Sequence, residues 1–183
     1  MRGLLIAAAA GLLAACSVET SDGAAVHVSG DAGPYEMQIA ASDAAQIYYV
    51  TGPDDRAAAA RVENGVSSVI DVAEARLAVG EARAAAADLG PIQDEALAIR
   101  VPGFSMTIAA EDDSAPGDSG RAQIAINAGG REVNVDASGD GEADGAIVRI
   151  SGASEDDARD FIRDAEELSA ETKDQMLAAL GLN

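Results

Sequence analysis

RAQIAINAGGREVNVD, residues 121–136, is the stretch that decides the fold class of this chain. Apolar and polar residues alternate on both sides of a central Asn-Ala-Gly-Gly sequence. A period of two is typical of a strand with one buried face, and a glycine-rich segment between two such strands favours a hairpin. The stretch therefore predicts two antiparallel strands, 121–126 and 131–136, joined through residues 127–130.

Other strand patterns lie on both sides of this hairpin. Residues 96–101 and 104–109 alternate well and are separated by Pro-Gly, which supplies turn geometry, and a further strand is expected at 146–150. Towards the N-terminus, residues 35–41 and 46–51 form a similar pair around Ser-Asp. The sequence therefore predicts antiparallel β-strands in two groups.

An alanine-rich segment between the two groups has helical signals. Asp71 and Glu74 have the spacing of a capping box, and Gly90-Pro91 is typical of a helix end. We therefore expect a long helix over residues 71–89. A shorter helical turn is predicted over residues 57–62, because Gly-Pro-Asp-Asp precedes it and Asn-Gly follows it.

The C-terminal residues predict a helical hairpin. Ser154 and three acidic residues after it favour a helix N-terminus and lead into a helix at 158–168. Ser169 begins a second helix, which ends at Gly181 in the pattern of a left-handed stop. The expected fold class is α+β, with the Ala-rich helix between the two strand groups and the C-terminal helical hairpin packed on a sheet.

The first fifteen residues differ from the rest of the chain. Arg2 is followed by an uninterrupted apolar run, residues 4–15, which has the layout of an export signal. A helix needs about 20 residues to cross a hydrocarbon core. We therefore interpret residues 1–15 as a signal peptide and not as a stable membrane span.

Leu13-Ala14-Ala15-Cys16 resembles the lipobox that ends the signal peptides of bacterial lipoproteins. The resemblance implies that a diacylglycerol with chains such as palmitate is added to the sulfur of Cys16. It also implies cleavage between Ala15 and Cys16 and acylation of the new amino terminus. Ser17 stands where an aspartate would imply retention at the inner membrane, so the resemblance favours the outer membrane, facing the periplasm.

The same resemblance divides the rest of the chain. Residues 16–25 are polar and contain glycine, which is typical of a tether, here a lipidated one. Residues 26–183 are expected to form a single α+β periplasmic domain, whose second half is similar to uncharacterised bacterial lipoproteins. Because Cys16 is the only cysteine, this domain has no disulfide.

The charge of the chain excludes one class of partner. Thirty-two acidic and 12 basic residues give a formal net charge of −20. Binding nucleic acid requires a clustered basic surface that neutralises phosphates, so no nucleic-acid partner is expected. An acidic surface is also repelled by anionic lipids, which leaves the acyl anchor on Cys16 as the contact with the membrane.

The residues that bear catalytic chemistry do not form a recognised pattern. Gly117-Asp118-Ser119-Gly120 resembles the sequence around a protease serine, but Arg121 follows it, and His27, the only histidine, lies in Val-His-Val like a strand residue. We therefore expect that the protein is not an enzyme and binds no cofactor.

The acidic segment 136–144 raises the question of a calcium loop. Asp136, Asp140 and Asp144 supply oxygen atoms at spaced positions, as in loops that resemble the EF-hand. Ile147 stands at the twelfth position, where such a loop needs a bidentate glutamate. The preferred interpretation is a solvated turn without metal, with weak cation binding at these residues as the alternative.

Two functions are compatible with this sequence. The first is a non-catalytic, lipid-anchored envelope protein with a structural or protein-interaction role and an envelope protein as its partner. The alternative is a lipoprotein that binds a small ligand or a cation through its acidic loops, 111–118 and 136–144.

Overall fold

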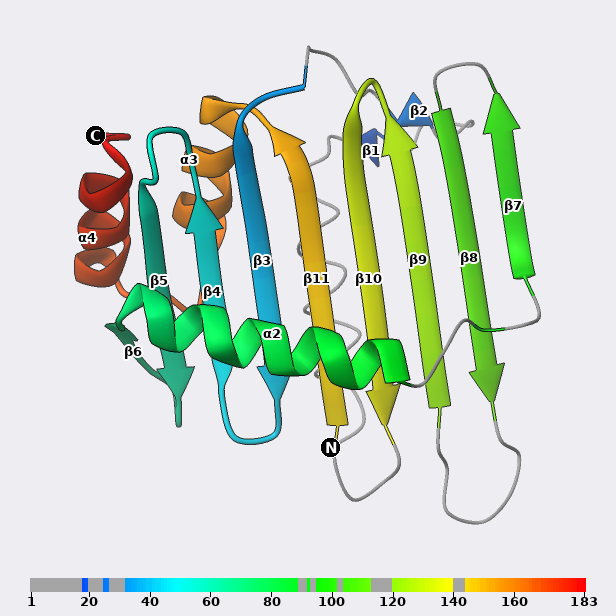
Figure 1. Ribbon diagram of the computed structural model, residues 1–183, viewed down its shortest axis with the longest axis horizontal. Helices are drawn as coiled ribbons and strands as arrows, with labels where there is room; N and C mark the ends of the chain where they lie inside the picture. Colours follow the sequence, from blue (N-terminus) through cyan, green and yellow to red (C-terminus); the bar gives the residue numbers. More distant parts are fainter. Residues whose placement is uncertain are drawn as a thin grey trace.

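One antiparallel sheet is the main element of the computed structural model, which describes residues 18–19, 25–26, 32–88, 92, 95–101, 104–112, 120–139 and 144–183. Nine strands are hydrogen-bonded in the order β6-β5-β4-β3-β11-β10-β9-β8-β7 (Figure 1). Their bounds are β3 (Tyr35–Ser42), β4 (Gln46–Thr51), β5 (Ala57–Glu63), β6 (Val66–Val69), β7 (Glu95–Val101), β8 (Phe104–Asp112), β9 (Gly120–Ala128), β10 (Arg131–Gly139) and β11 (Asp144–Ala153). A separate ladder joins β1 (Val18–Glu19) to β2 (Ala25–Val26).

The last strand joins the two predicted groups into one sheet. β11 lies between β3 and β10, so that Val148 is opposite Ile39 on one side and Val135 on the other. All the pairs in the sheet are antiparallel. The predicted α+β class is confirmed, but the strands form one continuous sheet and not two.

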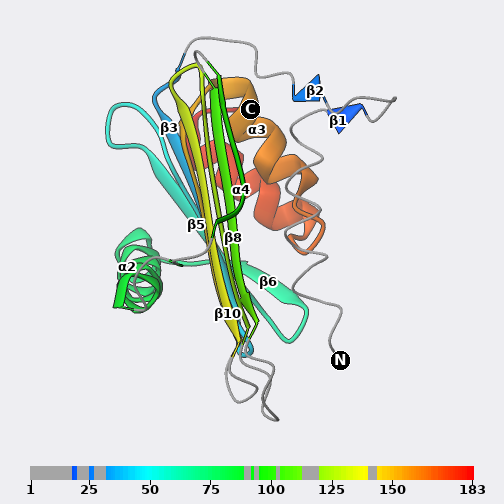
Figure 2. The ribbon, with the colours of Figure 1, turned by 90° about the vertical axis from the view of Figure 1, so that its right-hand side faces the viewer.

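Helices cover the two faces of the sheet unequally. α2 (Val72–Asp88) runs across one face, over β3, β4, β5, β10 and β11. α3 (Glu155–Asp164) and α4 (Ala170–Leu180) lie on the opposite face, where they contact β3, β5 and β6 (Figure 2). The half of the sheet built from β3 to β6 therefore has a helix layer on each side.

Each helix layer has its own core. On the α3 and α4 side, Ile162, Met176 and Leu180 are fully buried against Met37 and Val50. On the other side, a smaller core joins the helix to the sheet, and its buried members are Ala40, Ile47, Tyr49, Ala59, Ala75, Val79 and Ile147. Among the described helices, none is long and apolar enough to cross a bilayer.

The predicted helical turn at residues 57–62 is wrong, because this segment is strand β5. Ala59 packs against α2, whereas Ala58 and Ala60 face the core beneath α3 and α4. A strand buried on both faces needs small side chains where two helices approach it closely. Tertiary packing therefore overrides the helix propensity of the four alanines.

Asn64-Gly65, predicted as a helix stop, is instead the turn of a hairpin that joins β5 to β6. Both residues have positive φ angles, 51° and 76°, as a type I′ turn requires. Gly129 and Gly130 form a similar two-residue turn, with φ angles of 58° and 82°. Strand β9 therefore extends to Ala128, two residues beyond the predicted end at residue 126.

The predicted helix caps at the C-terminal end are confirmed. The side chain of Ser154 accepts a hydrogen bond from the backbone N–H of Asp157, which completes a capping box at α3. Ser169 caps α4 by accepting from the N–H of Thr172, and Gly181 ends it with φ of 71°. Helix α3 ends earlier than expected, at Asp164 and not at residue 168.

Tyr48 links the sheet to the segment between α3 and α4. Its hydroxyl donates to Oε2 of Glu167 at 2.8 Å, and its ring lies 6.1 Å from that of Phe161. Burial, and then the hydrogen bond to Glu167, raise the pKa of Tyr48 well above its ordinary value of 10.0. The folded chain therefore favours the neutral phenol.

This raised pKa predicts how Tyr48→Phe changes stability with pH. A group whose pKa is raised in the folded state stabilises the fold below its unfolded pKa and loses that contribution as the pH rises above about 10. Tyr48→Phe should cost about 1 kcal/mol at pH 7 and lose less stability than the wild type above pH 10. Urea denaturation at pH 7 to 10.5 measures both effects, and parallel pH curves for the two proteins would contradict the assignment.

Candidate functional site

Most of the residues singled out from the sequence lie outside the described part of the chain. These are Cys16, His27, Asp140 and residues 117–119 of the protease-like sequence. Asp144 is the first residue of β11, where it is opposite Gly139 in the ladder with β10. The strands on both sides of residues 140–143, which lie outside the described residues, are therefore regularly paired up to Gly139 and Asp144.

Asp136 lies in the middle of β10, where its carboxylate is already bound by two side chains. Arg121 donates to it through Nε at 3.2 Å and Nη2 at 2.8 Å, and Gln123 donates through Nε2 at 2.6 Å. The side chain of Arg121 is 9% exposed and that of Asp136 is 18% exposed. Calcium binding at Asp136 would therefore have to displace a largely buried guanidinium.

We expect Asp136→Asn to destabilise the fold, because it removes the negative charge beside a buried guanidinium. Breaking a buried ion pair costs about 3 to 5 kcal/mol, and this partly buried pair should lie near the lower figure. Asp54→Asn is the matched control, since Asp54 pairs with Arg56 at 3.4 Å with its side chain 84% exposed. The control should cost less than about 1 kcal/mol in urea denaturation. Equal losses would contradict the role of Arg121.

The same geometry predicts that millimolar calcium leaves the melting temperature nearly unchanged. A bound ion stabilises by RT ln(1 + [L]/Kd), about 2.7 kcal/mol at a hundredfold excess over Kd, which would shift the melt by a few degrees. Magnesium, and sodium at matched ionic strength, control for screening of the charge. A calcium-selective rise that is absent from Asp136→Asn would show that the ion displaces Arg121.

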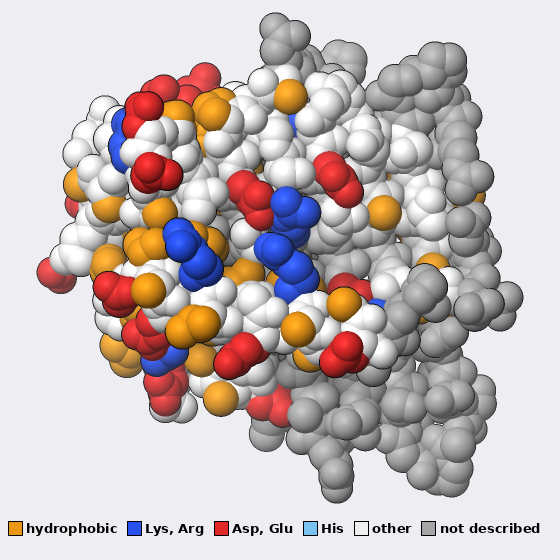
Figure 3. Space-filling model, in the orientation of Figure 1, with side chains coloured by type: hydrophobic (Ala, Val, Ile, Leu, Met, Phe, Trp, Pro, Cys, Tyr) orange, Lys and Arg blue, Asp and Glu red, His pale blue; other side chains and the backbone are white. Residues whose placement is uncertain are grey.

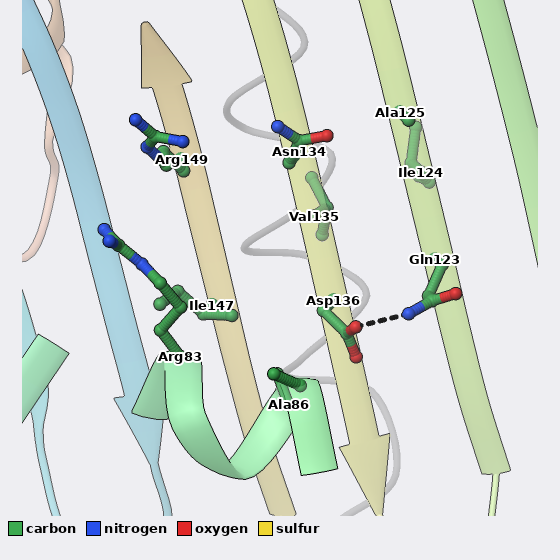
Figure 4. A pocket seen from close by; sticks show the side chains of 11 residues that line it. Arg83, Ala86, Gln123, Ile124, Ala125, Asn134, Val135, Asp136, Ile147 and Arg149 are labelled. Atoms are coloured by element: carbon green, nitrogen blue, oxygen red, sulfur yellow. Dashed lines mark hydrogen bonds between the residues drawn. The ribbon is translucent and has the colours of Figure 1, made fainter. Parts of the chain in front are cut away.

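A cleft of about 500 Å³ lies between the C-terminal half of α2 and strands β9, β10 and β11. Arg83 and Ala86 border it from the helix (Figure 4). On the sheet side, Ala125 and Ile147 are among its apolar residues, and the polar ones are Gln123, Asn134, Asp136 and Arg149. Figure 4 shows the two arginines towards one end and Asp136 with Gln123 towards the other.

The two arginines of this cleft both lie close to Glu36. Arg149 binds it through Nε at 2.8 Å and Nη2 at 3.1 Å, and the hydrogen bond to Glu36 raises the pKa of Arg149. Nη2 of Arg83 lies 2.7 Å from Oε1 of Gln38 and 3.8 Å from Oε1 of Glu36. Figure 3 shows basic side chains gathered in the middle of this face, with acidic ones around them. The two arginines of the cleft are thus already paired with Glu36 and Gln38.

The opposite face of the sheet carries a second feature, an apolar surface beyond α3. Ladder pairing aligns Met106, Ile126, Val133 and Ile150 in one row across β8 to β11. Ile108, Ile124, Val135 and Val148 form the next row. These rows continue through Met37 and Ile39 into the core beneath α3 and α4.

We call Met106, Ile108, Ile124, Ile126, Val133 and Val135 the open apolar face. All six side chains are intermediate in exposure. Val135 borders the core, and Arg131 at the start of β10 forms an ion pair of 2.7 Å with Asp157 of α3. The main contacts of α3 and α4 with the described strands lie on β3, β5 and β6, so that these helices pack chiefly on that half of the sheet (Figure 2).

The sequence contained the signal for this surface. Large apolar residues stand two positions apart in each of the segments 104–109, 121–126 and 131–136, and the strands lie side by side. The unpredicted feature is the position of the covering helices, which follows from the place of β11 in the sheet.

Comparison of the chain with protein-family models, with curated proteins and with solved structures gives no match.

Proposed function

We propose that this chain is a lipid-anchored, non-catalytic protein of the bacterial envelope, acylated on Cys16. Its folded domain has a structural or protein-interaction role and faces the periplasm from the outer membrane. The proposed location rests on the resemblance of residues 1–16 to lipoprotein signals, and the interaction role rests on the open apolar face.

The open apolar face is the observation that supports an interaction role. The neighbouring residues of the same strands, which point to the α2 side, include Thr107, Gln123, Asn127 and Asn134. The α2 side of β8 to β10 is therefore polar and suited to contact with water, whereas the opposite side is apolar. A contiguous apolar surface on a folded protein marks a site of contact with another molecule, because burial contributes about 25 cal/mol per Å² of apolar area.

The distribution of charge supports the same assignment. A chain with a net charge of −20 repels other acidic proteins through most of its surface. The six side chains of the open apolar face carry no charge. A protein partner could therefore approach this face with the smallest electrostatic cost.

A pull-down from cross-linked envelopes tests this function. The acylated wild-type chain should retain a specific protein that the Ile126→Glu variant loses, because a carboxylate in an apolar contact is costly to bury. Asn127→Glu is the matched control, since the neighbouring side chain points to the other face and is exposed. Retention of the same partner by both variants would contradict a role for the open apolar face.

Small-ligand binding is a second candidate, which the cleft beneath α2 favours over the acidic loops. The half-exposed guanidinium of Arg83 suits a carboxylate-bearing ligand, because arginine binds carboxylates through paired hydrogen bonds. Arg149 is already bound in this way by Glu36. Succinate at about 10 mM, a concentration chosen to exceed a weak Kd, should then raise the melting temperature of the wild type but not of Arg83→Gln. Arg163→Gln, outside the cleft, is the control. No shift against sodium chloride of equal ionic strength would exclude this candidate.

A further inference from the structure

We infer that the C-terminal half of α2, residues 81–88, is a lid over the cleft that opens by bending of the helix at Gly80. The N-terminal half, residues 72–79, stays packed on the sheet. The inference goes beyond the interaction role proposed above, and it does not depend on a ligand in the cleft. It divides α2 into a part that fixes the helix to the sheet and a part that covers the cleft.

The two halves of α2 differ in how firmly they pack on the sheet. The buried side chains of the helix both lie before Gly80, where Ala75 is 0% and Val79 is 2% exposed. After Gly80, the side chains packed against the core are Ala82 and Ala86, and both are only partly buried. Because an alanine side chain buries little apolar area, the hydrophobic contribution that holds this half on the sheet is small.

Gly80 stands at the middle of the 17-residue helix, between the two halves. A methyl group at this position would meet nothing within 4 Å in the described part of the chain beyond the helix itself, so close packing does not require a glycine here. Glycine has the weakest helix propensity of any residue except proline, and it weakens the helix at this point. Residues 84–87 are all alanine, which favours helix, so the bend is expected at Gly80 and not beyond it.

Polar contacts from the sheet hold the lid closed. Nη2 of Arg83 donates to Oε1 of Gln38 at 2.7 Å, and Nη2 of Arg121 donates to the backbone carbonyl of Ala86 at 3.1 Å. The last turn of the helix contains Asp88 and no basic residue, a charge that the helix dipole disfavours at this end. The side chain of Arg83 is 52% exposed, so water can replace Gln38 as its partner at a small cost.

The cleft lies directly beneath the lid. Arg83 and Ala86 border its volume of about 500 Å³ from the helix, and Figure 4 shows Arg83 beside Ile147, which is 8% exposed. A bend at Gly80 would lift this border and expose Ile147 together with the polar residues Gln123 and Asn134 on the sheet side. Because Arg83 belongs to the lid, a ligand bound by its guanidinium would be bound by the part that moves.

Thiol labelling of the full chain, without any ligand, tests the lid. Ile147→Cys places a thiol beneath the lid. Ala59→Cys is the matched control, since Ala59 is 0% exposed and lies on β5, over which the first half of α2 runs (Figure 1). A buried thiol reacts with maleimide only when its cover opens. Mass spectrometry of the peptides measures each thiol separately from Cys16.

We expect Ile147→Cys to be labelled about tenfold faster than Ala59→Cys, because only its cover opens locally. Adding Gly80→Ala should slow the labelling of Ile147→Cys about fivefold, since alanine favours the straight helix. Arg83→Gln should speed it up, whereas Arg76→Gln, which removes a contact of the first half with Tyr49, should not. Equal labelling of the two thiols, or no effect of Gly80→Ala, would overturn the lid.

Amide hydrogen exchange of the chain without cysteine substitutions is a second measurement that avoids changes in the core. Since a short helix detached from the sheet is marginal in water, residues 81–88 should exchange together, about tenfold faster than residues 76–79. Simple fraying would instead give a gradual increase towards Asp88, and it would overturn the lid. Failure of succinate to raise the melting temperature would exclude the carboxylate ligand and leave the lid in place.

Discussion

Replacing Cys16 with serine is expected to abolish acylation and leave an uncleaved precursor. The sulfur of the proposed lipobox is the acceptor of diacylglycerol, and a thiol reacts as the strongly nucleophilic thiolate, whereas a hydroxyl does not. In the proposed pathway, the lipid is added to the sulfur before the peptidase cuts. The variant should therefore retain residues 1–15 and lack the mass of the lipid.

Mass spectrometry of the membrane fraction measures this result. The wild type should give an N-terminal peptide that begins at Cys16 and carries acyl chains, and Ser17→Ala, one residue away, should behave like the wild type. An unmodified mature protein that begins at another residue would contradict the lipoprotein assignment. Loss of the variant from the membrane is a weaker readout, since an uncleaved apolar signal also binds lipid.

Replacing Ile162 with alanine is expected to cause the largest loss of stability among the substitutions considered. Ile162 is 0% exposed and lies where α3 packs on the sheet. Removing its three carbon atoms loses transfer energy and leaves a cavity, at a cost of about 2 to 5 kcal/mol. Since many domains are stable by only about 5 to 15 kcal/mol, this is a large share.

Urea denaturation of the purified variant checks the value. Leu77→Ala is the control, because Leu77 is also helical but 69% exposed, and its loss should be below about 0.5 kcal/mol. An unchanged m-value would show that the denatured state is the same in both. A similar loss in the two variants would mean that α3 and α4 do not form the main core.

The local elements could be predicted where one face or one cap decides the structure. The helix at 71–89 was expected within one residue of α2, and Ser169 and Gly181 were identified as the ends of α4. β5 could not be predicted in this way, since its alanines face helices on both sides and have no alternation to reveal a strand. The helix predicted over residues 57–62 also hides β6, because it makes Asn64-Gly65 a helix end and not the turn of a hairpin.

The contacts in the candidate sites depend on which strands pair and in which register, and the sequence alone does not give this. Arg121 and Asp136 meet because Gly129-Gly130 sets the register that puts Gln123 opposite Asp136. With a two-residue turn assumed there, this contact could have been predicted. The cleft beside α2 could not, since it requires the angle at which the helix crosses the sheet.

The central position of β11 has a consequence for the order of folding. β3 and β11 are separated by about a hundred residues, so their pairing closes a long loop and is slow relative to the hairpins. Until β11 arrives, β3 and β10 each present an unpaired edge, to which strands of other chains can add. A nascent chain that ends before residue 144 would therefore consist of two separate hairpin arrays prone to aggregation. The last strand of the sheet is the one that makes the molecule a single cooperative unit.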